Sequence, residues 1–587
     1  MAGTLPLQGQ SVESLVVKDT PPSTQQSIDA ALVTLQAQKN AWVLVGVRQR
    51  VGLIDELIKN LGAVAQSWVT LCLEAKGLAP DTPAAVDEWL GGPYLILKFL
   101  RQLRQSLIDI DRYGRPRIPG AVKTRPDGQV VVQVFPQKFY DRLFYGGITA
   151  EVWMEPQVTL AQLPQTQALV YQNQDHPGKV ALVLGAGNVS CLGPTDLLYK
   201  LFVEDQVVIL KTHPVNAYLG PLIEESFRPL IDRGFLQVVS GGANEGKYLC
   251  YHPQVDEIHL TGAAATFEAI IFGPGPEGAR RKAERKPLLT KRITGELGNV
   301  SPVIVVPGPW SSRQVEYHAT NLASMLVTNA GFNCLTTRVI IQHKDWELRH
   351  DLLDRTRHIL ADIPPRKAYY PGAEARYLAY MAEHPEAEQF GSPPDGTLPW
   401  TLIPDLDPWN EAEICYRTEA FCSIFSETAI EASSVPEFID RAVAFANNNL
   451  WGTLNATLIV HPDTLADPTN ASAVDRALAN LRYGTIAINH WAAVGYGLVA
   501  STWGGYPGQD IYDIQSGLGV VHNTLMFSRP QKSIIQGRFM DKLTPLWFVT
   551  HRTAHEVGRK LTSFETSPSL WRLPSLIWSA VRGSFRI

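Results

Sequence analysis

The sequence has few cysteines, and their spacing excludes several classes of protein. Six occur in 587 residues, and none forms a CxxC pair or another spacing typical of metal ligands, so we expect no metal site and no disulfide framework. In so large a chain this pattern predicts reduced thiols and a cytoplasmic protein. The six are Cys72, Cys191, Cys250, Cys334, Cys415 and Cys422.

Long hydrophobic runs and an excess of basic residues are also missing. No apolar stretch reaches the roughly 18 residues that a membrane-spanning helix needs. The N-terminal stretch MAGTLPLQGQSVESL has no charged segment followed by an apolar one, so we expect no secretory signal. The formal net charge is −5, which disfavours nucleic acid as a partner.

The hydrophobic pattern that is present predicts a large α/β core. Residues 24–76 and 94–111 repeat apolar positions at helical spacing. From residue 179 onward, short apolar runs alternate with helical segments, which predicts parallel sheets covered by helices on both faces. These runs are too many for one sheet, so we expect two doubly wound α/β lobes that divide near residue 297. The runs are KVALVLG, QVVILK, FLQVVSGG, EIHLTG, NVSPVIVVPG, RVIIQ, ATLIVHP and TIAINH.

Two segments stand apart from this alternation. The run QVVVQVF, residues 129–135, alternates in polarity and predicts a strand of a hairpin. Residues 363–410 are rich in Pro, Asp and Tyr, and we interpret them as a long surface excursion.

Cys334 lies at an unusual junction in the stretch NAGFNCLTTRVI. It follows Gly331 and Asn333, which indicate a bend, and it precedes the β-branched run Val339-Ile340, which indicates the start of a buried strand. A structural cysteine usually has apolar neighbours on both sides, whereas a thiol at a junction of this kind can point into a cleft. The position therefore makes Cys334 a candidate nucleophile.

Three segments could contribute to a nucleotide site, and each also has an ordinary structural explanation. GAGNVS, residues 185–190 with Asn188, follows a strand, but it lacks the third glycine of a dinucleotide fingerprint and also suits a simple strand-to-helix turn. Lys211 at the end of the next strand could hold a sugar hydroxyl or reach solvent from the sheet edge. Thr261 and Gly262 precede a helix whose N-terminus could bind phosphate or only pack closely.

Two acidic residues are candidates for chemistry. Glu296 stands between two glycines before a buried strand, where a partly desolvated carboxylate can act as a general base or lie in a surface turn. Glu419 precedes the small-residue segment AFCS and could equally cap a helix. Taken alone, neither position decides between these interpretations.

The candidates follow one another in a distinctive order. A strand with an Asn turn, a strand-end Lys, a Thr-Gly at a helix start, a Glu-Leu-Gly, a Gly-x-x-Cys 35 to 38 residues later and a Glu-x-Phe occur in that sequence. Their order and spacing resemble the aldehyde dehydrogenase superfamily over about residues 24–76 and 155–535. The resemblance implies a Rossmann-like cofactor lobe and a catalytic lobe with a small β bridging element for oligomerisation.

The resemblance also divides the chain. It implies N-terminal helices plus a dinucleotide-binding domain, bridging strands, a catalytic thiol domain, and a C-terminal extension that the family pattern does not cover. These are residues 1–128 with 156–296, residues 129–155 with 517–537, residues 297–516, and residues 538–587, respectively.

The resemblance assigns roles to the catalytic candidates. Cys334 matches the nucleophile, which forms a thiohemiacetal with an aldehyde and then a thioester. Asn188 matches the oxyanion-hole amide, which acts with the backbone N–H of Cys334, and such donors contribute about 3–4 kcal/mol each. Glu296 matches the base that activates water to hydrolyse the thioester.

The remaining candidates match residues of the cofactor site. Lys211 corresponds to the residue that holds the adenosine ribose, and Glu419 with Phe421 to the Glu-x-Phe motif that holds the nicotinamide ribose. Thr261 and Gly262 correspond to the start of the helix that faces the pyrophosphate. The implied cofactor is NAD or NADP.

Several positions depart from the family pattern. Pro214 stands where many NAD-using members carry a glutamate, which leaves the choice between NAD and NADP open. Ala263 replaces a serine that commonly touches phosphate, and Phe332 and Asn333 replace the usual residues before the cysteine. Asn299 stands where a second glycine is usual. The chain is therefore a divergent relative.

Three functions are compatible with these residues. The first is NAD(P)-dependent oxidation of a small-molecule aldehyde, long-chain or aromatic, to a carboxylic acid. The second is a CoA-dependent acylating aldehyde dehydrogenase or acyl-CoA reductase on the same scaffold. Members of that class usually lack the base that Glu296 matches, so its presence favours hydrolysis. The third is a catalytically silent nucleotide-binding scaffold, which the retention of Asn188, Glu296, Cys334 and Glu419 disfavours.

The resemblance predicts a homodimer or a higher homo-oligomer, because the hairpin near 129–155 and the run GVVHNTLMF, 519–527, match strands that add to a neighbour's sheet edge. The C-terminal extension, 538–587, carries eight Arg or Lys against three Asp or Glu, interleaved with Trp and Phe. It either packs over the protein's own surface or its partner's as a lid, or makes a peripheral contact with a membrane surface.

Overall fold

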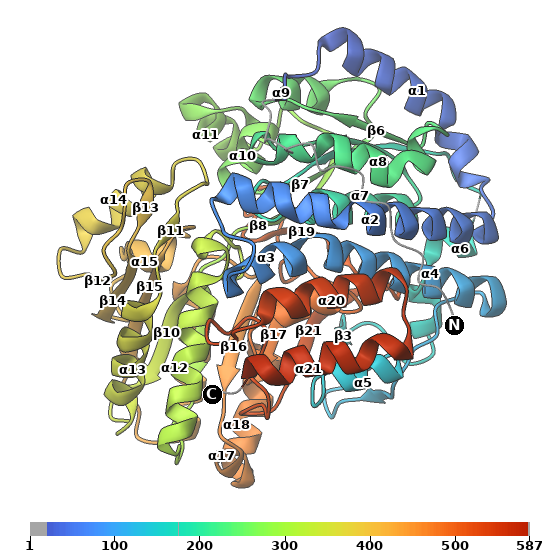
Figure 1. The fold of residues 1–587 in the computed structure, drawn as a ribbon. Helices are drawn as coiled ribbons and strands as arrows, with labels where there is room; N and C mark the ends of the chain where they lie inside the picture. The colour runs from blue at the N-terminus through green and yellow to red at the C-terminus, as the bar shows by residue number, and fades with distance from the viewer. Residues whose placement is uncertain (1–19, 174, 585–587) are drawn as a thin grey trace, which may run out of the picture.

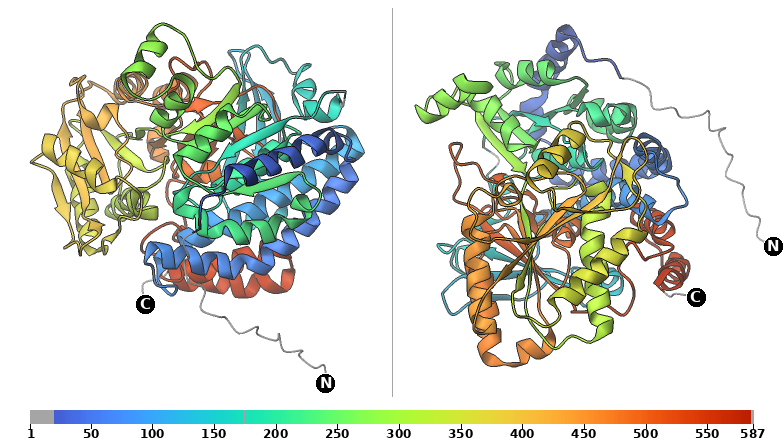
Figure 2. Two further views of the ribbon diagram at one scale, coloured as in Figure 1. Left: turned by 90° about the horizontal axis from the view of Figure 1, so that it is seen from above. Right: turned by 90° about the vertical axis from the view of Figure 1, so that its left-hand side faces the viewer.

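The computed structural model of the protein describes residues 20–173 and 175–584 (Figure 1). The chain forms two α/β lobes, each built around its own sheet, and the first lobe lies above the second in the right-hand view of Figure 2. This confirms the predicted fold class. The N-terminal stretch for which we expect no secretory signal lies outside the described residues.

The first lobe contains a six-stranded sheet that is parallel except for one edge strand. Every residue of its two central apolar runs, 180–184 and 207–211, is buried, as expected for strands covered by helices on both faces. In spatial order the strands are β19 (Gly517–Leu518), β8 (Arg292–Leu297), β7 (Glu257–Gly262), β4 (Val180–Leu184), β5 (Val207–Lys211) and β6 (Leu236–Val239).

The second lobe contains an eleven-stranded sheet with a parallel centre and antiparallel strands at both ends. The chain passes from the first sheet to the second between residues 297 and 301. The strands, in spatial order, are β1 (Val122–Thr124), β2 (Val130–Phe135), β3 (Thr149–Met154), β21 (Pro530–Gln536), β17 (Thr485–Ile488), β16 (Asn455–Ile459), β9 (Ser301–Val305), β10 (Thr337–His343), β15 (Ile424–Ile430), β14 (Trp400–Leu406) and β12 (Glu388–Phe390).

The helices predicted over residues 24–76 and 94–111 are present in the structure. Periodic apolar residues over 24–76 form two helices, and those over 94–111 form a third, whose predicted face is buried. The helices are α1 (Gln25–Val43), α2 (Val47–Lys76), α3 (Val86–Trp89), α4 (Leu95–Tyr113), α5 (Phe139–Phe144), α6 (Leu169–Gln172), α7 (Leu192–Phe202), α8 (Gly220–Ile231), α9 (Ala243–Tyr251), α10 (Ala264–Phe272) and α11 (Gly275–Ala283), with short helices η1 (Pro83–Ala85), η2 (Leu90–Tyr94), η3 (Leu163–Thr166) and η4 (Pro214–Leu219).

The second lobe places its helices around the larger sheet. Two small two-stranded sheets pair β11 (Arg366–Lys367) with β13 (Thr397–Leu398), and β18 (Thr502–Trp503) with β20 (Val521–His522). The helices are α12 (Ser312–Val327), η5 (Thr328–Gly331), α13 (Arg349–Asp362), α14 (Ala373–Glu383), α15 (Ile414–Arg417), α16 (Val435–Asn449), α17 (Pro462–Ala466), α18 (Pro468–Asn480) and α19 (Ala493–Leu498).

The prediction that residues 363–410 form a surface excursion is wrong. This segment contains α14 and contributes β14 and β12 to the main sheet. Tyr377, Tyr380 and Trp400 are buried in the core of the second lobe. Most of the Pro and Asp residues lie in the turns of this segment, whereas these aromatic residues pack in the core of the second lobe.

The bridging strands join the sheet of their own chain. Strand β21 pairs on one side with β3 of the predicted hairpin and on the other with β17 of the catalytic sheet. The predicted strand 519–527 is replaced by 530–536, and only Val521–His522 of the former is a strand, paired with β18. Strand β21 therefore has strand partners on both sides within one chain, and the homo-oligomer stays a prediction.

The C-terminal extension folds back on the first lobe. Helix α20 (Ala554–Thr566) lies beside α2, α3 and α4, as Figure 1 shows. Helix α21 (Leu573–Ser584), which follows η6 (Leu570–Arg572), packs against α20. Val557, Leu561 and Phe564 form a small buried cluster with Tyr94. The inward faces of the extension therefore cover the protein's own surface, as one of the two predicted arrangements requires.

Two further observations concern the expected lack of disulfides and of membrane-spanning helices. All six cysteines are free thiols, as predicted. Among the helices of residues 20–173 and 175–584, none combines the length and the apolar character that spanning a bilayer requires.

Candidate active site

Cys334 lies in a tightly bent loop between α12 and β10. Asn329, Ala330 and Gly331 adopt positive φ angles of 52°, 55° and 79° in succession. Gly331 is required there, because a Cβ atom at this position would lie 2.3 Å from the carbonyl oxygen of Cys422. Arg338 fixes the loop by donating from Nη2 to the Gly331 carbonyl at 2.6 Å and from Nη1 to that of Cys422 at 2.7 Å. The half-buried Cys334 is thus held on a rigid bend.

The structure brings the Cys334 thiol close enough to Glu296 for the two groups to influence each other's ionisation. Glu296 is buried near the end of β8 in the first lobe, whereas Cys334 belongs to the second, so the pair forms where the lobes meet. The indole N–H of Trp503 donates to Glu296 Oε1 at 3.2 Å. A nucleophile in contact with a base, and a base oriented by a third group, is the arrangement that activates a weak nucleophile.

Burial sets the ionisation of this pair. It raises the pKa of Glu296 to about 7, although the hydrogen bonds from Cys334 and Trp503 oppose the increase. Burial also raises the pKa of the Cys334 thiol well above its ordinary value, and the charges of Glu296 and Glu419 raise it further. The thiol is therefore protonated at neutral pH, and a carboxylate that can accept its proton lies next to it.

Trp503→Phe is expected to move the pH dependence of activity. Glu296 acts as a base only when ionised, so activity should rise with pH through about 7 and be lost below it. Losing the indole donor destabilises the carboxylate and raises the pKa of Glu296, so the acidic limb should shift by about one pH unit toward alkaline. The pH profile of kcat/KM measures this, with Trp409→Phe, an exposed tryptophan in the other lobe, as control. An unshifted limb in Trp503→Phe would contradict this role of the indole.

Asn188 is placed against the same loop. It is buried after β4, and its side-chain Nδ2 donates to the carbonyl oxygen of Phe332 at 3.0 Å, two residues before Cys334. A side-chain amide carries two N–H donors, so this bond orients the group toward the cysteine loop and leaves it a second donor. The positions of Asn188, Cys334 and Glu296 agree with the grouping that the sequence predicts.

A buried polar cluster behind Asn188 was not predicted. Lys76 at the end of α2 forms an ion pair with Glu88 at 2.7 Å, with side chains only 6% and 2% exposed. Its Nζ also donates to Asn329 Oδ1 at 2.9 Å and to the Asn188 carbonyl at 3.3 Å. The hydroxyl of Tyr369 donates to the same two oxygens at 2.9 and 2.8 Å. The cluster therefore joins the Asn188 turn of the first lobe to the cysteine loop of the second lobe through the end of helix α2.

Lys76→Met is expected to destabilise the protein by about 3–5 kcal/mol, because it leaves the Glu88 carboxylate buried without its cation. The thermal unfolding midpoint should fall clearly. The control Arg280→Met breaks exposed pairs with Glu277 and Glu284 and should leave the midpoint nearly unchanged. A midpoint for Lys76→Met that equals that of Arg280→Met would refute the structural role of the buried pair.

Most of the residues predicted to hold a nucleotide lie at the carboxyl ends of neighbouring strands in the first sheet. Asn188 follows β4, Lys211 ends β5, Thr261 and Gly262 end β7, and Glu296 lies beside Thr261 in the register of β7 and β8. These strands are neighbours, and the carboxyl ends of parallel strands form the crevice in which α/β proteins bind ligands. Lys211 is buried there, and this burial lowers its pKa.

The Thr261 side chain faces the protein interior instead of this crevice. Its hydroxyl donates to the carboxylate of buried Asp196 at 2.7 Å. Any contact with a phosphate at this position therefore involves the backbone at Gly262 and the N-terminus of α10, which begins at Ala264 after Ala263.

Glu419 and Phe421 lie on the second lobe beside the thiol. Glu419 Oε1 is buried and has no hydrogen-bond partner among the described residues, and burial raises the pKa of the group to about 7. A Cβ on the neighbouring Gly298 would lie only 2.0 Å from Glu419 Oε2. An unpartnered carboxylate oxygen next to a nucleophile suits a ribose hydroxyl, so the residues present fit a nicotinamide nucleotide.

Aromatic rings connect the two lobes next to this position. Tyr370 stacks on His213 with ring centroids 5.9 Å apart and packs edge-on against Phe421 at 5.0 Å. Phe421 in turn lies 6.1 Å from Phe332 in the cysteine loop. Tyr370 was missed because its segment was interpreted as a surface excursion.

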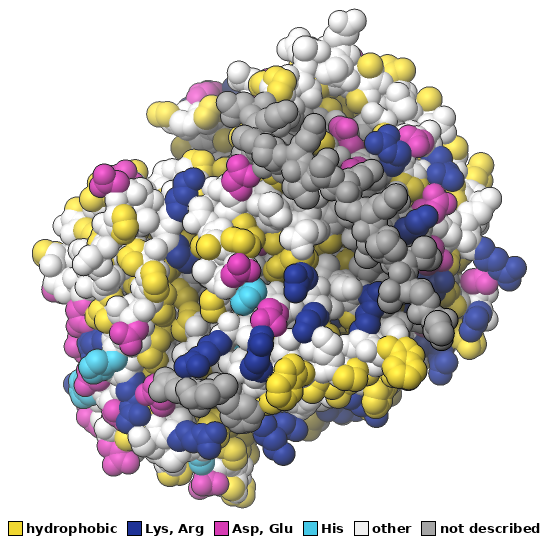
Figure 3. All heavy atoms as spheres, viewed as in Figure 1, with side chains coloured by type: hydrophobic (Ala, Val, Ile, Leu, Met, Phe, Trp, Pro, Cys, Tyr) yellow, Lys and Arg dark blue, Asp and Glu magenta, His cyan; other side chains and the backbone are white. Residues whose placement is uncertain are grey.

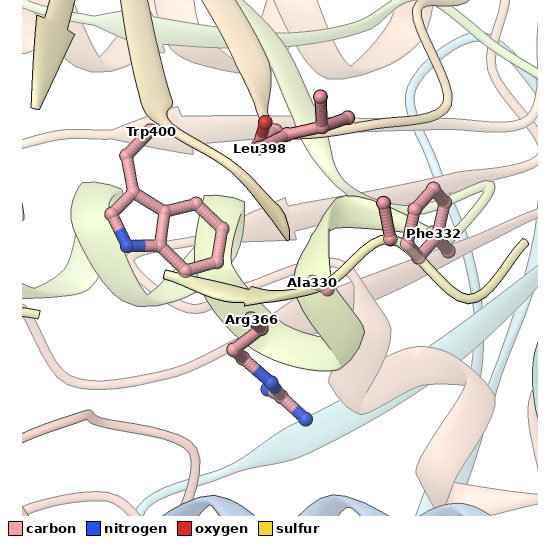
Figure 4. A pocket seen from close by; sticks show the side chains of 7 residues that line it. Ala330, Phe332, Arg366, Leu398 and Trp400 are labelled. Carbon is pink, nitrogen blue, oxygen red and sulfur yellow. The ribbon is translucent and has the colours of Figure 1, made fainter. Parts of the chain in front are cut away.

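A small pocket behind the cysteine loop is separate from this site. It is lined by Ala330, Phe332, Arg366, Ala368, Leu398, Trp400 and Ser423, most of which Figure 4 labels. Neither Cys334 nor Glu296 lines it. Arg366 there donates to Asp87 at 2.8 Å and so reaches the first lobe.

One cluster of potential metal ligands is present, although the spacing of cysteines in the sequence predicts none. His384, Glu413 and Cys415 are buried with their donor atoms within 4.8 Å of one another. Glu413 Oε1 is bonded to His384 Nε2 at 2.8 Å and to the backbone N–H of Cys415 at 3.0 Å. These contacts cap α15, so hydrogen bonding accounts for the cluster.

Comparison with known proteins gives a consistent family. Residues 159–372 match the sequence model of the aldehyde dehydrogenase family. The chain is 23% identical to zebrafish (Danio rerio) 4-trimethylaminobutyraldehyde dehydrogenase A over 51% of its own length and 56% of that protein. It is 25% identical to aminoacetaldehyde dehydrogenase of Pseudomonas aeruginosa, with the same two coverages. The chain thus spans about half the length of the curated relatives it matches.

Solved structures extend the likeness to most of the fold. A Mycobacterium tuberculosis aldehyde dehydrogenase complexed with NAD+ aligns over 88% of this chain and 91% of its own, with a TM-score of 0.59 and 17% identity. The NADP-dependent glyceraldehyde-3-phosphate dehydrogenase of Bacillus halodurans, complexed with NADP, aligns over 88% and 92% with a TM-score of 0.59 and 15% identity.

The fold and the site define a two-lobed α/β protein with a buried thiol–carboxylate pair at the edge of a Rossmann-like sheet. Residues 159–372 match the aldehyde dehydrogenase family model, and the described fold is similar to that of solved aldehyde dehydrogenases.

Proposed function

We propose that the protein oxidises a small-molecule aldehyde to a carboxylic acid with NAD or NADP, using Cys334 as the nucleophile. The observation that carries the proposal is the buried contact between Cys334 and Glu296 with Trp503 behind it. A structural cysteine gains nothing from a neighbouring carboxylate, since the charge makes the thiolate harder to form. A catalytic cysteine gains a proton acceptor.

The first step joins the aldehyde to the protein. The thiol proton passes to the Glu296 carboxylate, and Sγ forms a bond to the carbonyl carbon, giving a thiohemiacetal. The oxygen that becomes negative then needs hydrogen-bond donors at the cysteine loop. Asn188, whose amide is already directed to the loop, and the backbone N–H of Cys334 supply them.

The residues at the sheet edge would hold the nucleotide. Lys211 would bind one ribose, Gly262 and the start of α10 the pyrophosphate, and Glu419 Oε1, which lacks a partner among the described residues, the other ribose. When bound, the nicotinamide supplies the hydride acceptor that turns the thiohemiacetal into a thioester. Pro214 follows Lys211 by three residues and offers no carboxylate for a 2′-hydroxyl, so both nucleotides are candidates.

The second half of the reaction releases the acid. After the proton taken from the thiol has passed to solvent, Glu296 takes a proton from water and the water oxygen bonds to the acyl carbon. The Cys334 sulfur then leaves and recovers a proton from Glu296. A CoA thiol in place of water would make the protein an acylating enzyme. The burial that raises the pKa of Glu296 to about 7 makes it a competent base near neutral pH, which favours water.

The test is to follow the absorbance of reduced nicotinamide with a panel of aldehydes. The panel contains short, long-chain, aromatic and amino-substituted aldehydes, each with NAD and NADP and with and without CoA. Turnover without CoA, with free acid as product, supports the proposal. Turnover only with CoA identifies the acylating alternative, and nucleotide binding without turnover on any aldehyde identifies a silent scaffold.

A further inference from the structure

The outward face of the C-terminal helix pair carries an unusual set of exposed apolar side chains. Trp571 is 92% exposed and Trp578 66% exposed, and Leu570 and Ile577 beside them are exposed as well. We call these four residues the α21 patch. The opposite face of α21 is buried through Leu573 and Leu576, so the helix is anchored and the patch is held outward. Large apolar side chains gathered on an anchored surface helix indicate a binding surface.

The apolar surface continues onto α5. Phe139 and Leu143 of this helix are exposed. On its inner side Tyr140 and Phe144 pack against Phe564 of α20, with ring centroids 5.0 and 5.2 Å apart. Helix α5 is thus fixed to the same helix pair that carries the α21 patch.

Cationic residues accompany the patch. Arg559, Lys560, Arg572 and Arg582 lie on α20, η6 and α21. The acidic residues of the same helices are Glu556, which pairs with Arg582, and Glu565, whose side chain is largely buried beside Arg101. Figure 3 shows hydrophobic side chains in a row across this face, with Lys and Arg on both sides.

The chemistry of this face identifies its partner. Tryptophan favours the boundary between lipid headgroups and acyl chains, where the ring is apolar and the indole N–H remains hydrated. Arg and Lys beside it attract anionic headgroups, each strengthening binding by about fivefold. The apolar side chains project from a helix, and this suits insertion into a soft interface.

We propose that the face formed by α5 and α21 docks on the surface of an anionic lipid bilayer, with Trp571 and Trp578 inserted among the headgroups. This is peripheral binding by helices lying in the interface. None of the residues involved belongs to the candidate active site, so the proposal does not depend on the proposed function. It combines the two arrangements that the sequence left open, since the inner face of the extension covers the protein and the outer face contacts lipid.

The test is flotation of the full chain with phosphatidylcholine vesicles that contain or lack phosphatidylglycerol. The wild type should float with the anionic vesicles and much less with the neutral ones. Trp571→Ser/Trp578→Ser should reduce the bound fraction at least about tenfold. The matched control is Trp409→Ser, because Trp409 is 68% exposed on the second lobe and should not contribute. High salt should weaken binding of the wild type.

Several outcomes would overturn the proposal. One is a wild-type protein that does not float with anionic vesicles at low salt. Another is a double variant that floats as well as Trp409→Ser. If light scattering shows association of the wild type that the double variant abolishes, without flotation, the patch binds a second copy instead. Equal circular dichroism and thermal midpoints of the variants show that these exposed substitutions leave the fold intact.

Discussion

Cys334→Ala is expected to lower aldehyde turnover at least about 1,000-fold, because covalent catalysis has no substitute for the sulfur. Nucleotide binding should persist. The predicted nucleotide residues lie on β5, β7 and the segment around Glu419, and none uses the thiol as a hydrogen-bond partner. Removing the sulfur also removes a group whose burial is unfavourable when charged, so folding should be maintained.

The comparison that isolates the nucleophile is Cys415→Ala. Cys415 is equally a buried thiol, but its sulfur lies 3.9 Å from His384 Nε2, outside the candidate site. This variant should keep turnover near the wild-type value. Retained turnover in Cys334→Ala, or equal losses in the two variants, would remove Cys334 from its role.

Glu296→Gln is expected to separate the two halves of the reaction. The amide cannot accept a proton from water, so steady-state turnover should fall by about 100-fold or more. Formation of the thioester also loses the acceptor of the thiol proton. It should nevertheless be less affected, because losing the carboxylate charge removes one of the effects that raise the pKa of the Cys334 thiol and so eases loss of that proton. Rapid mixing with aldehyde and nucleotide should therefore give a burst of reduced nicotinamide followed by slow turnover.

A matched amide substitution checks that the burst reports on this site. Glu277→Gln changes the same functional group on exposed α11 and should give wild-type kinetics. If the burst and the steady-state rate of Glu296→Gln fall by the same factor, hydrolysis is not selectively slowed, and this contradicts the role of Glu296 as the water-activating base.

The parts of the fold that the sequence predicts are those in which local pattern and tertiary environment agree. The runs ending at Leu184 and Lys211 are continuous, apolar and short, and they form parallel strands covered on both faces. The stretch around Cys334 combines glycine and asparagine before a β-branched run, and the structure places three left-handed residues and then a strand there. A bend followed by a strand can therefore be predicted from the types of residue in the sequence.

The parts that the sequence does not predict depend on long-range contacts. Lys76 precedes Gly77 at the end of an ordinary amphipathic helix, and only folding shows that it is buried against Glu88 and Asn329. Trp503 lies in a glycine-rich segment far from Glu296 along the chain, so its hydrogen bond has no local signature. In both cases burial, which a single sequence does not report, turns an ordinary residue into part of the site.

The bridging strands were predicted less accurately, because their positions also depend on long-range pairing. Residues 519–527 have the composition of a strand, but left-handed residues at His522, Asn523 and Met526 break the run. The following segment, Pro530–Gln536, pairs instead with β3 and β17. The resemblance therefore predicted a strand in this part of the chain but assigned it to the wrong segment, because several neighbouring segments suit the same pair of strands.

The most direct test of the central claim is to identify the residue that carries the acyl group. Glu296→Gln would be mixed with an aldehyde and the nucleotide that support wild-type turnover, quenched in acid, digested and analysed by peptide mass spectrometry. The account predicts one added acyl group, equal to the aldehyde minus two hydrogens, on the sulfur of Cys334. An acyl group on another residue, or none on a protein whose wild type oxidises that aldehyde, would contradict it.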